Sequence, residues 1–220
     1  MFFKRLDMNI TIIGAGNMGA AFAKQLTRAG HKVSVTSRDP AKAARVAAAN
    51  SGAVAVPAEG AAAAAANADL IVLATAYVDA VGALRTLGDL RGKVVIDITN
   101  PLTADFMGLT IGHTTSAAEE IAKAVPAANV VKAFNTLFAQ VLDNGADFGV
   151  GQKVSVLVAG DNAHAKQTVS LLAESMGFAT LDVGGLKNAR YLEPLAGLNI
   201  YLGYGAGMGT SIAPGWVRKV

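Results

Sequence analysis

The sequence contains no cysteine, and this absence excludes disulfide bonds, thiolate nucleophiles and thiolate metal sites. Its 220 residues include only three histidines, so a metal site built from histidines is not expected. Charged residues are also few, at 16% of the chain, and aromatic residues make up 6%. Hydrophobic residues, by contrast, make up 52%, which supplies a buried core and excludes an intrinsically disordered chain. We therefore expect one folded domain, or one domain with a short appendage.

The charge balance indicates what kind of partner the protein has. The formal net charge is +3, and the lysines and arginines are scattered along the chain. No nucleic acid partner is expected, whereas an anionic small molecule fits this balance. Residues 1–13 contain too short an apolar run for a signal peptide, which predicts a cytoplasmic protein. Residues 194–217 are uncharged, but their glycines favour a helix packed inside the protein or at a dimer interface over a membrane span.

Short apolar runs alternate with helical patterns every 20 to 30 residues or so, which predicts a parallel sheet covered by helices on both faces. Strands are expected at residues 9–13, 32–36, 54–56, 70–74, 94–98, 129–133, 153–158 and 178–181. Helices are expected at residues 20–29, 40–50, 57–67, 77–87, 116–124, 163–175 and from 186 to about 212. The fold class is therefore α/β, a Rossmann-type doubly wound parallel sheet with a small C-terminal α/β lobe that ends in a long helix. We place the Rossmann domain at residues 8–150 and the lobe at 151–220.

A glycine loop follows the first expected strand and opens the first helix, which is the context of a dinucleotide-binding fingerprint. Gly14 permits the tight turn, Gly16 lets the backbone approach a pyrophosphate, and Gly19 lets helix and strand pack closely. The positive end of the helix favours the anion. The cofactor-binding residues expected here are Gly14, Ala15, Gly16, Asn17, Met18 and Gly19.

The end of the second strand indicates which dinucleotide binds. An NAD site usually carries an acid there, but this strand ends in Thr36, Ser37 and Arg38. The planar guanidinium suits a phosphate dianion, and Lys42 lies one helical turn further on. Ser37, Arg38 and Lys42 are therefore expected to bind the 2′-phosphate of NADP(H), and Asp39 to cap the next helix.

Later strand ends should meet the same cofactor, because ligands bind beyond the carboxyl ends of parallel strands. We expect cofactor contacts from Ala74, Thr75, Ala76, Asn100 and Pro101, and reaction-site contacts from Asn135 and Leu137. For Thr75, Asn100 and Asn135, capping of their own loops is an equally good interpretation. No Ser/His/Asp set appears at the spacing of a nucleophile elbow, and no Tyr-x-x-x-Lys pair follows the sheet. The absence of a protein acid or base favours hydride transfer to a flavin or deazaflavin ring.

The sequence resembles the F420-dependent NADP oxidoreductase family over nearly the whole chain after residue 7. The matching segments are residues 14–19 (GAGNMG), 36–42 (TSRDPAK), 94–102 (VVIDITNPL), 130–136 (VVKAFNT), 158–162 (VAGDN) and 184–198 (GGLKNARYLEPLAGL). The resemblance supports the 2′-phosphate site and adds Ala133 to the cofactor-binding residues. It implies hydride transfer between NADP(H) and coenzyme F420 or a flavin, FMN or FAD, as the small-molecule acceptor. The sequence is similar as well to the reductase domain of membrane ferric reductases.

The resemblance also implies a homodimer whose residues 151–220 serve acceptor binding and dimerisation. Asn135 stands where some relatives have histidine, and Ala76–Tyr77 replaces an expected Pro–Trp pair. The glycines of residues 203–209 would admit either a flat ring or a partner helix. Arg190 is expected to pair with Glu193 on the same helix.

Two other functions fit the same residues. One is an NADP(H)-binding sensor without turnover, since no acid or base stands out. The other is an imine or carbonyl reductase of the pyrroline-carboxylate type, which shares the GxGNMG loop but has a longer chain.

Overall fold

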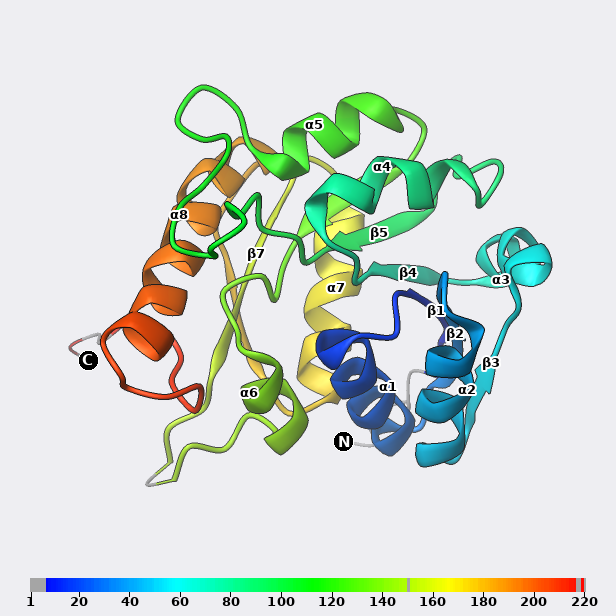
Figure 1. Ribbon diagram of the computed structural model, residues 1–220, viewed down its shortest axis with the longest axis horizontal. Coiled ribbons are helices and arrows are strands. Elements are labelled where there is room, and N and C mark those ends of the chain that lie inside the picture. The colour runs from blue at the N-terminus through cyan, green and yellow to red at the C-terminus, as the bar shows by residue number, and fades with distance from the viewer. Residues whose placement is uncertain (1–6, 150, 217–218, 220) are drawn as a thin grey trace.

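The computed structural model describes residues 7–149, 151–216 and 219, so residues 1–6 and Val217, which entered the predictions above, lie outside the described residues. The described chain forms an eight-stranded sheet in the order β3–β2–β1–β4–β5–β6–β7–β8 (Figure 1). Its strands are β1 (Asn9–Ile13), β2 (Lys32–Thr36), β3 (Ala53–Ala55), β4 (Leu70–Leu73), β5 (Val94–Asp97), β6 (Asn129–Lys132), β7 (Ser155–Gly160) and β8 (Ala179–Asp182). The α/β Rossmann-type fold predicted from the sequence is confirmed.

The strands pair in parallel, except that β7 runs antiparallel to β6. In the first half, Ile12 of β1 lies opposite Val35 of β2 and Val72 of β4. All four residues of β4 are buried, as expected for a central parallel strand with both faces covered. The strands β7 and β8 continue the same sheet beyond β6.

Helices cover both faces of the sheet. A core of buried side chains joins the sheet to α1 (Asn17–Ala29), α2 (Pro40–Ala49), α6 (Ala139–Asn144) and α7 (Ala163–Ser175). A second core joins the opposite face to α3 (Ala61–Asn67), α4 (Tyr77–Arg85) and α5 (Ala117–Ala124). The remaining long helix, α8 (Ala189–Ile200), packs Leu192 against Leu157 and Ala159 of β7. Figure 1 shows α4 and α5 side by side, with α8 at the other end of the molecule from α2.

Local signals in the sequence set several helix ends. Gly30 terminates α1 in the left-handed region at φ 93°, where glycine carries no Cβ penalty. The Asp39 side chain accepts hydrogen bonds from the first turn of α2, which begins with Pro40. Ser116 and Asn162 cap α5 and α7 in the same way.

Several elements differ from the sequence prediction. The helix α1 begins at Asn17 rather than at residue 20, and α3 begins at Ala61 rather than at residue 57. The seventh strand begins at Ser155 and ends at Gly160, two residues later than expected, and the six-residue α6 was not expected. The terminal helix ends earlier: α8 runs to Ile200, a π-helical turn follows at Tyr201–Gly205, and residues 206–216 are irregular. Gly207 and Gly209 adopt φ of 74° and 78°, which a right-handed helix cannot contain. None of the helices described is long and apolar enough to cross a membrane.

Candidate cofactor and acceptor site

The order of the strands places a crevice at the carboxyl ends of β1 and β4. Connections from β1 run to β2 and β3 on one side, and the chain then returns to β4 on the other. At such a switch point the loops after the two strands separate, and ligands bind between them. The glycine loop follows β1 and residues 74–76 follow β4, so both predicted segments lie at this crevice.

The glycine loop is held so closely that two of its positions admit no side chain. A Cβ on Gly14, at φ 113°, would lie 2.3 Å from the backbone oxygen of Ala74. A Cβ on Gly19 would lie 2.0 Å from the oxygen of Gly14. A Cβ on Gly16, by contrast, would meet no protein atom within 4 Å. Gly14 and Gly19 thus close the loop, and Gly16 faces open space.

The N-terminus of α1 lies at this open space. Its N-cap is Gly16, no side chain caps the helix, and its first turn contains no acid. The leading N–H groups of a thirteen-residue helix therefore lack side-chain acceptors and carry the positive end of the helix dipole. This is the environment that an anion such as a pyrophosphate requires.

A cavity of about 660 Å³ extends from the glycine loop to the end of β2. Its lining brings together most of the predicted cofactor residues: Gly14, Ala15, Gly16, Ser37, Arg38, Lys42, Ala74, Thr75 and Ala76. The hydroxyl oxygen of Thr75 is buried and has no hydrogen-bond partner. The sequence analysis did not anticipate the wall formed by α4 and the turn after it: α4 contributes Val78, Asp79, Gly82 and Ala83, and the turn contributes Thr86 and Leu87.

The predicted phosphate-binding residues lie at one end of this first cavity. The guanidinium of Arg38 donates to both carboxylate oxygens of Asp79 on α4, over 3.1 and 2.9 Å. Arg38 is 85% exposed at its side chain, whereas that of Asp79 is 33% exposed. The Ser37 hydroxyl accepts a hydrogen bond from the backbone N–H of Asp39. The basic end of the cavity therefore contains one acid that sequence reasoning missed.

A second cavity of about 520 Å³ begins on the other side of the glycine loop, at Asn17 and Met18. Three residues predicted for the site, Asn100, Asn135 and Leu137, line it too. The rest of its wall contains Phe106 and Met107 from a loop, Phe138, and Asn199, Ile200 and Tyr204 from the C-terminal segment. The Phe138 and Tyr204 rings pack edge to face with centroids 5.7 Å apart. This cavity is bounded by aromatic rings that the sequence did not link to one another.

Asn100 and Asn135 are bound to each other at the floor of the second cavity. Asn135 donates to Asn100 Oδ1 and to the backbone oxygen of Leu192, both over 3.0 Å, and Asn100 donates to the oxygen of Asn135 over 2.9 Å. These hydrogen bonds join segments 35 and 57 residues apart, so the two amides connect separate loops and α8 rather than cap their own loops. Asn135 Oδ1 is nevertheless buried without a partner, so an acceptor remains for a ligand N–H.

Backbone strain sets the position of Asn135. The preceding residue, Phe134, is fully buried at φ 61°, an uncommon conformation for an aromatic residue. Its ring packs edge to face against Phe22 and Phe178, at centroid distances of 5.0 and 6.2 Å. These contacts hold the strained residue and turn the chain sharply at the end of β6.

A buried ion cluster lies beneath the two asparagines. Lys132 contacts Asp97 over 2.7 Å and Glu193 over 2.9 Å, and it donates to the oxygen of Thr99 over 2.7 Å. All three charged side chains are at most 1% exposed. Glu193 also accepts from the first two N–H groups of α5. The prediction that Arg190 pairs with Glu193 is therefore wrong.

Arg190 pairs instead with Glu119 of α5, over 2.8 and 2.7 Å. The pair lies across two packed helices, and this geometry leaves Glu193 free to face inward. The hydrogen bonds from Arg190 hold the pKa of the Glu119 carboxyl below its usual value. Burial, and then the nearby carboxylates of Glu120 and Glu193, raise the pKa of the Tyr77 phenol above its usual value.

Three predicted cofactor residues line neither of these cavities: Gly19, Pro101 and Ala133. Ala133 is completely buried, and its N–H donates to the oxygen of Asp97. For Gly203, the sequence allowed two interpretations, a site for a flat ring or a dimer interface. A Cβ there would lie 2.6 Å from the ring of Phe138, so the close approach is made within the chain. Within the described residues, no cluster of His, Asp and Glu could hold a metal ion.

The residues present fit a bound dinucleotide phosphate. The open space at Gly16, the uncapped helix end and the orphaned hydroxyl of Thr75 offer a cradle and donors for phosphate and ribose. Ser37, Arg38 and Lys42 offer a cationic site for a further phosphate. Such a crevice on a doubly wound sheet is typical of the class of dinucleotide-binding proteins.

Comparison with known proteins narrows the class. Residues 9–101 match the family described as "NADP oxidoreductase coenzyme F420-dependent". The chain is 33% identical over 215 residues to an F420-dependent NADP reductase from Methanothermobacter thermautotrophicus, covering 90% of each chain. The chain belongs to this family, and it is an NADP-dependent oxidoreductase. The family prediction from the sequence is confirmed.

The predicted similarity to ferric reductases is also confirmed. The chain is 33% identical over 187 residues to Metalloreductase STEAP3 of Rattus norvegicus, but it spans only 36% of the length of that protein. A crystal structure from Arthrobacter sp. fb24, provisionally assigned as an F420-dependent NADP reductase, superposes with a TM-score of 0.84 at 31% identity. It covers 96% of this chain and 100% of its own. An imine reductase from Pseudomonas sp. is 21% identical, with a TM-score of 0.65 over 91% of this chain and 64% of its own, which shows the shared fold alone.

Proposed function

We propose that the protein transfers hydride between NADP(H) and a planar acceptor, coenzyme F420 or a flavin. The observation that carries this proposal is the position of the two cavities on either side of the glycine loop. Gly14, Ala15 and Gly16 line the first, and the next two residues, Asn17 and Met18, line the second. A ligand that lies along the first cavity and crosses the loop would therefore bring its far end to the second.

The residues of the first cavity would bind the adenosine half of the cofactor. The N-terminus of α1 and Gly16 would bind the pyrophosphate, and Ser37, Arg38 and Lys42 the 2′-phosphate. The unpartnered Oδ1 of Asn135 would accept a hydrogen bond from the nicotinamide carboxamide and so orient the ring. The nicotinamide ring is the part of the cofactor that would supply the hydride.

The residues of the second cavity would bind the acceptor. Phe106, Met107, Phe138 and Tyr204 present apolar and aromatic surface, and Phe106 and Tyr204 are each 61% exposed. Such surface suits a flat heteroaromatic ring. Hydride transfer requires the donor and acceptor carbons to lie about 3 to 3.5 Å apart. The titratable groups lining this cavity are Asp105 and Tyr204. The chain's contribution would be positioning rather than proton transfer.

The test is NADPH oxidation followed at 340 nm, with F420, FMN and FAD offered in turn and NADH as the control donor. We expect oxidation with at least one acceptor and a strong preference for NADPH. Substitution Tyr204→Ala should raise the KM for the acceptor and leave the KM for NADPH unchanged. Binding of NADPH without oxidation by any of the three acceptors would refute the proposal and favour a sensor.

A further inference from the structure

Asp79 is an acid in the lining of the first cavity that faces Arg38, whereas the other acid of that lining, Asp39, caps α2 with its side chain. Asp79 lies in the first turn of α4, across the first cavity from the end of β2. Its two carboxylate oxygens accept from the two terminal nitrogens of Arg38, so the pair is bidentate. Arg38 and Asp79 are 41 positions apart in the sequence, so their ion pair connects two separate elements of the crevice.

A phosphate dianion at Arg38 would bind to the same edge of the guanidinium, the one formed by its two terminal nitrogens. Arginine binds carboxylate and phosphate through parallel N–H donors, and the two terminal nitrogens form one such fork. Because Asp79 already accepts from both nitrogens, a phosphate at Arg38 must displace the carboxylate or accept through the remaining edge. In either arrangement the dianion lies close to a carboxylate of like charge, which is unfavourable.

We propose that Asp79 is a specificity-determining residue that competes with the 2′-phosphate of NADP(H) for Arg38. This inference rests on the proposed function, because it requires the 2′-phosphate to bind at Arg38. The competition weakens the binding of the phosphorylated dinucleotide and does not affect NAD(H), which lacks the phosphate. Asp79 therefore lowers the ratio by which the protein discriminates between the two cofactors.

The exposure of the pair sets the size of the effect. The Arg38 side chain is 85% exposed, so water screens the interaction, and exposed ion pairs are individually weak. We expect Asp79→Asn to tighten binding of the 2′-phosphorylated ligand about three- to fivefold. Asparagine keeps the size of the side chain and one acceptor oxygen, but removes the negative charge.

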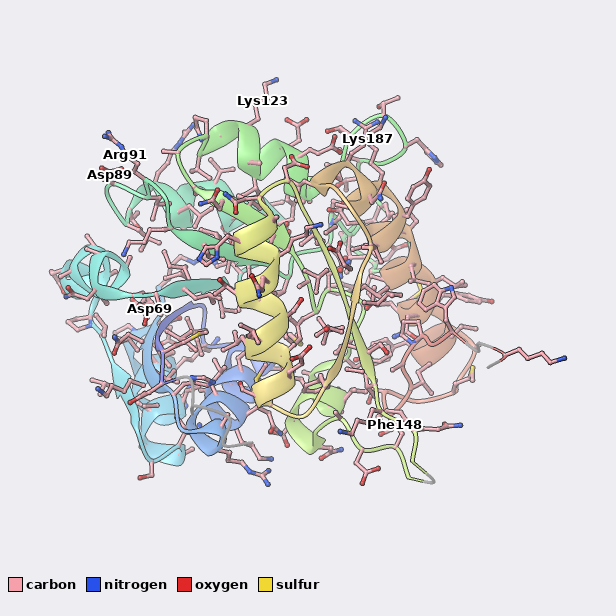
Figure 2. The ribbon with its side chains drawn as sticks, turned by 180° about the vertical axis from the view of Figure 1, so that it is seen from behind. Asp69, Asp89, Arg91, Lys123, Phe148 and Lys187 are labelled. Atoms are coloured by element: carbon pink, nitrogen blue, oxygen red, sulfur yellow. The ribbon has the colours of Figure 1, made fainter. Side chains whose placement is uncertain are left out.

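The experiment isolates the phosphate by measuring calorimetric affinities for 2′,5′-ADP and for 5′-AMP. These two ligands differ only at the 2′ position, and neither needs an acceptor or turnover. The variants are Asp79→Asn, Arg38→Ala and the double substitution. Asp89→Asn is the matched control, because Asp89 is an exposed acid beside Arg91 at the outer surface (Figure 2) and is not among the residues lining the first cavity.

We expect Asp79→Asn to tighten 2′,5′-ADP and leave 5′-AMP unchanged, and the gain to fall below about twofold when Arg38 is alanine. Unchanged or weaker binding of 2′,5′-ADP by Asp79→Asn would overturn the inference, as would equal tightening of both ligands or the same gain in Asp89→Asn. Failure of the underlying cofactor assignment has a different signature. In that case Arg38→Ala would weaken 2′,5′-ADP no more than 5′-AMP.

Discussion

Replacing Lys132 with methionine should cost more stability than any exposed charge substitution in the protein. The ammonium group lies 2.7 Å from a carboxylate oxygen of Asp97 and 2.9 Å from one of Glu193, and it donates a hydrogen bond to the oxygen of Thr99. Methionine fills similar volume but leaves two carboxylates buried next to each other. Removing one partner of a buried ion pair costs about 3–5 kcal/mol, a large part of the roughly 5–15 kcal/mol that stabilises a typical domain.

Urea unfolding followed by circular dichroism measures this loss. Lys166→Met is the matched control, because Lys166 also pairs with an acid, Asp182, whose side chain is 59% exposed. That substitution should cost at most about 1 kcal/mol. The m-values should stay equal, so that the change in midpoint reports stability alone.

A double substitution tests the electrostatic reasoning itself. Lys132→Met leaves the cluster with two negative charges, and adding Glu193→Gln reduces them to one. The double variant should therefore be more stable than Lys132→Met, although Glu193→Gln by itself is destabilising. A loss below about 1 kcal/mol for Lys132→Met, or additive losses in the double variant, would refute the account of a compensated buried cluster.

Three further outcomes follow from the same structure. Gly19→Ala should destabilise the protein and abolish NADPH binding, because the new Cβ would meet the backbone oxygen of Gly14. Gly16→Ala should weaken NADPH binding, measured by calorimetry, and lower the free energy of unfolding by about 1 kcal/mol or less. Glu119→Gln should lower the melting temperature at pH 7. Because Arg190 lowers the pKa of Glu119, the difference in melting temperature between the variant and the wild type should shrink as the pH falls below about 4.5. A difference that does not depend on pH would contradict the ion pair. Leu198→Asp should shift the predicted homodimer to monomer in light scattering, because Tyr191, Leu198 and Tyr201 expose 52–74% of their surface on α8 and the turn after it.

The first half of the fold was predictable because each element carries its own local signal. The strand, glycine loop and helix of residues 9–29 form a unit whose turn, cap and core face are all encoded in adjacent residues. The capping of α2 by Asp39 is equally local. The antiparallel entry of β7 beside β6 was not predictable, because a strand's apolar pattern does not encode the direction of its neighbour.

Most of the residues predicted for the site follow a strand end. Thr75 and Asn135 are two of them and line the cavities, whereas Asp79 lies in the first turn of α4, where an acid is common at the surface of a helix. The partner of Arg190 was missed for a related reason. A neighbour three residues away suggested a local pair, but Glu119, 71 positions distant, is the residue it contacts.

The buried cluster shows why the C-terminal segment is part of the site rather than an appendage to it. The helix α8 contains a single acid, Glu193, and the buried strands β5 and β6 contain an acid, Asp97, and a lysine, Lys132. Buried charges need partners, which made these three residues candidates to pair with one another. The residue before Glu193, Leu192, accepts a hydrogen bond from Asn135 through its backbone. Since Lys132 lies three positions before Asn135 on the chain, α8 is attached both to the strand that ends at the site and to the site residue itself. A change in the position of α8 must therefore move Asn135, and with it the floor of the second cavity.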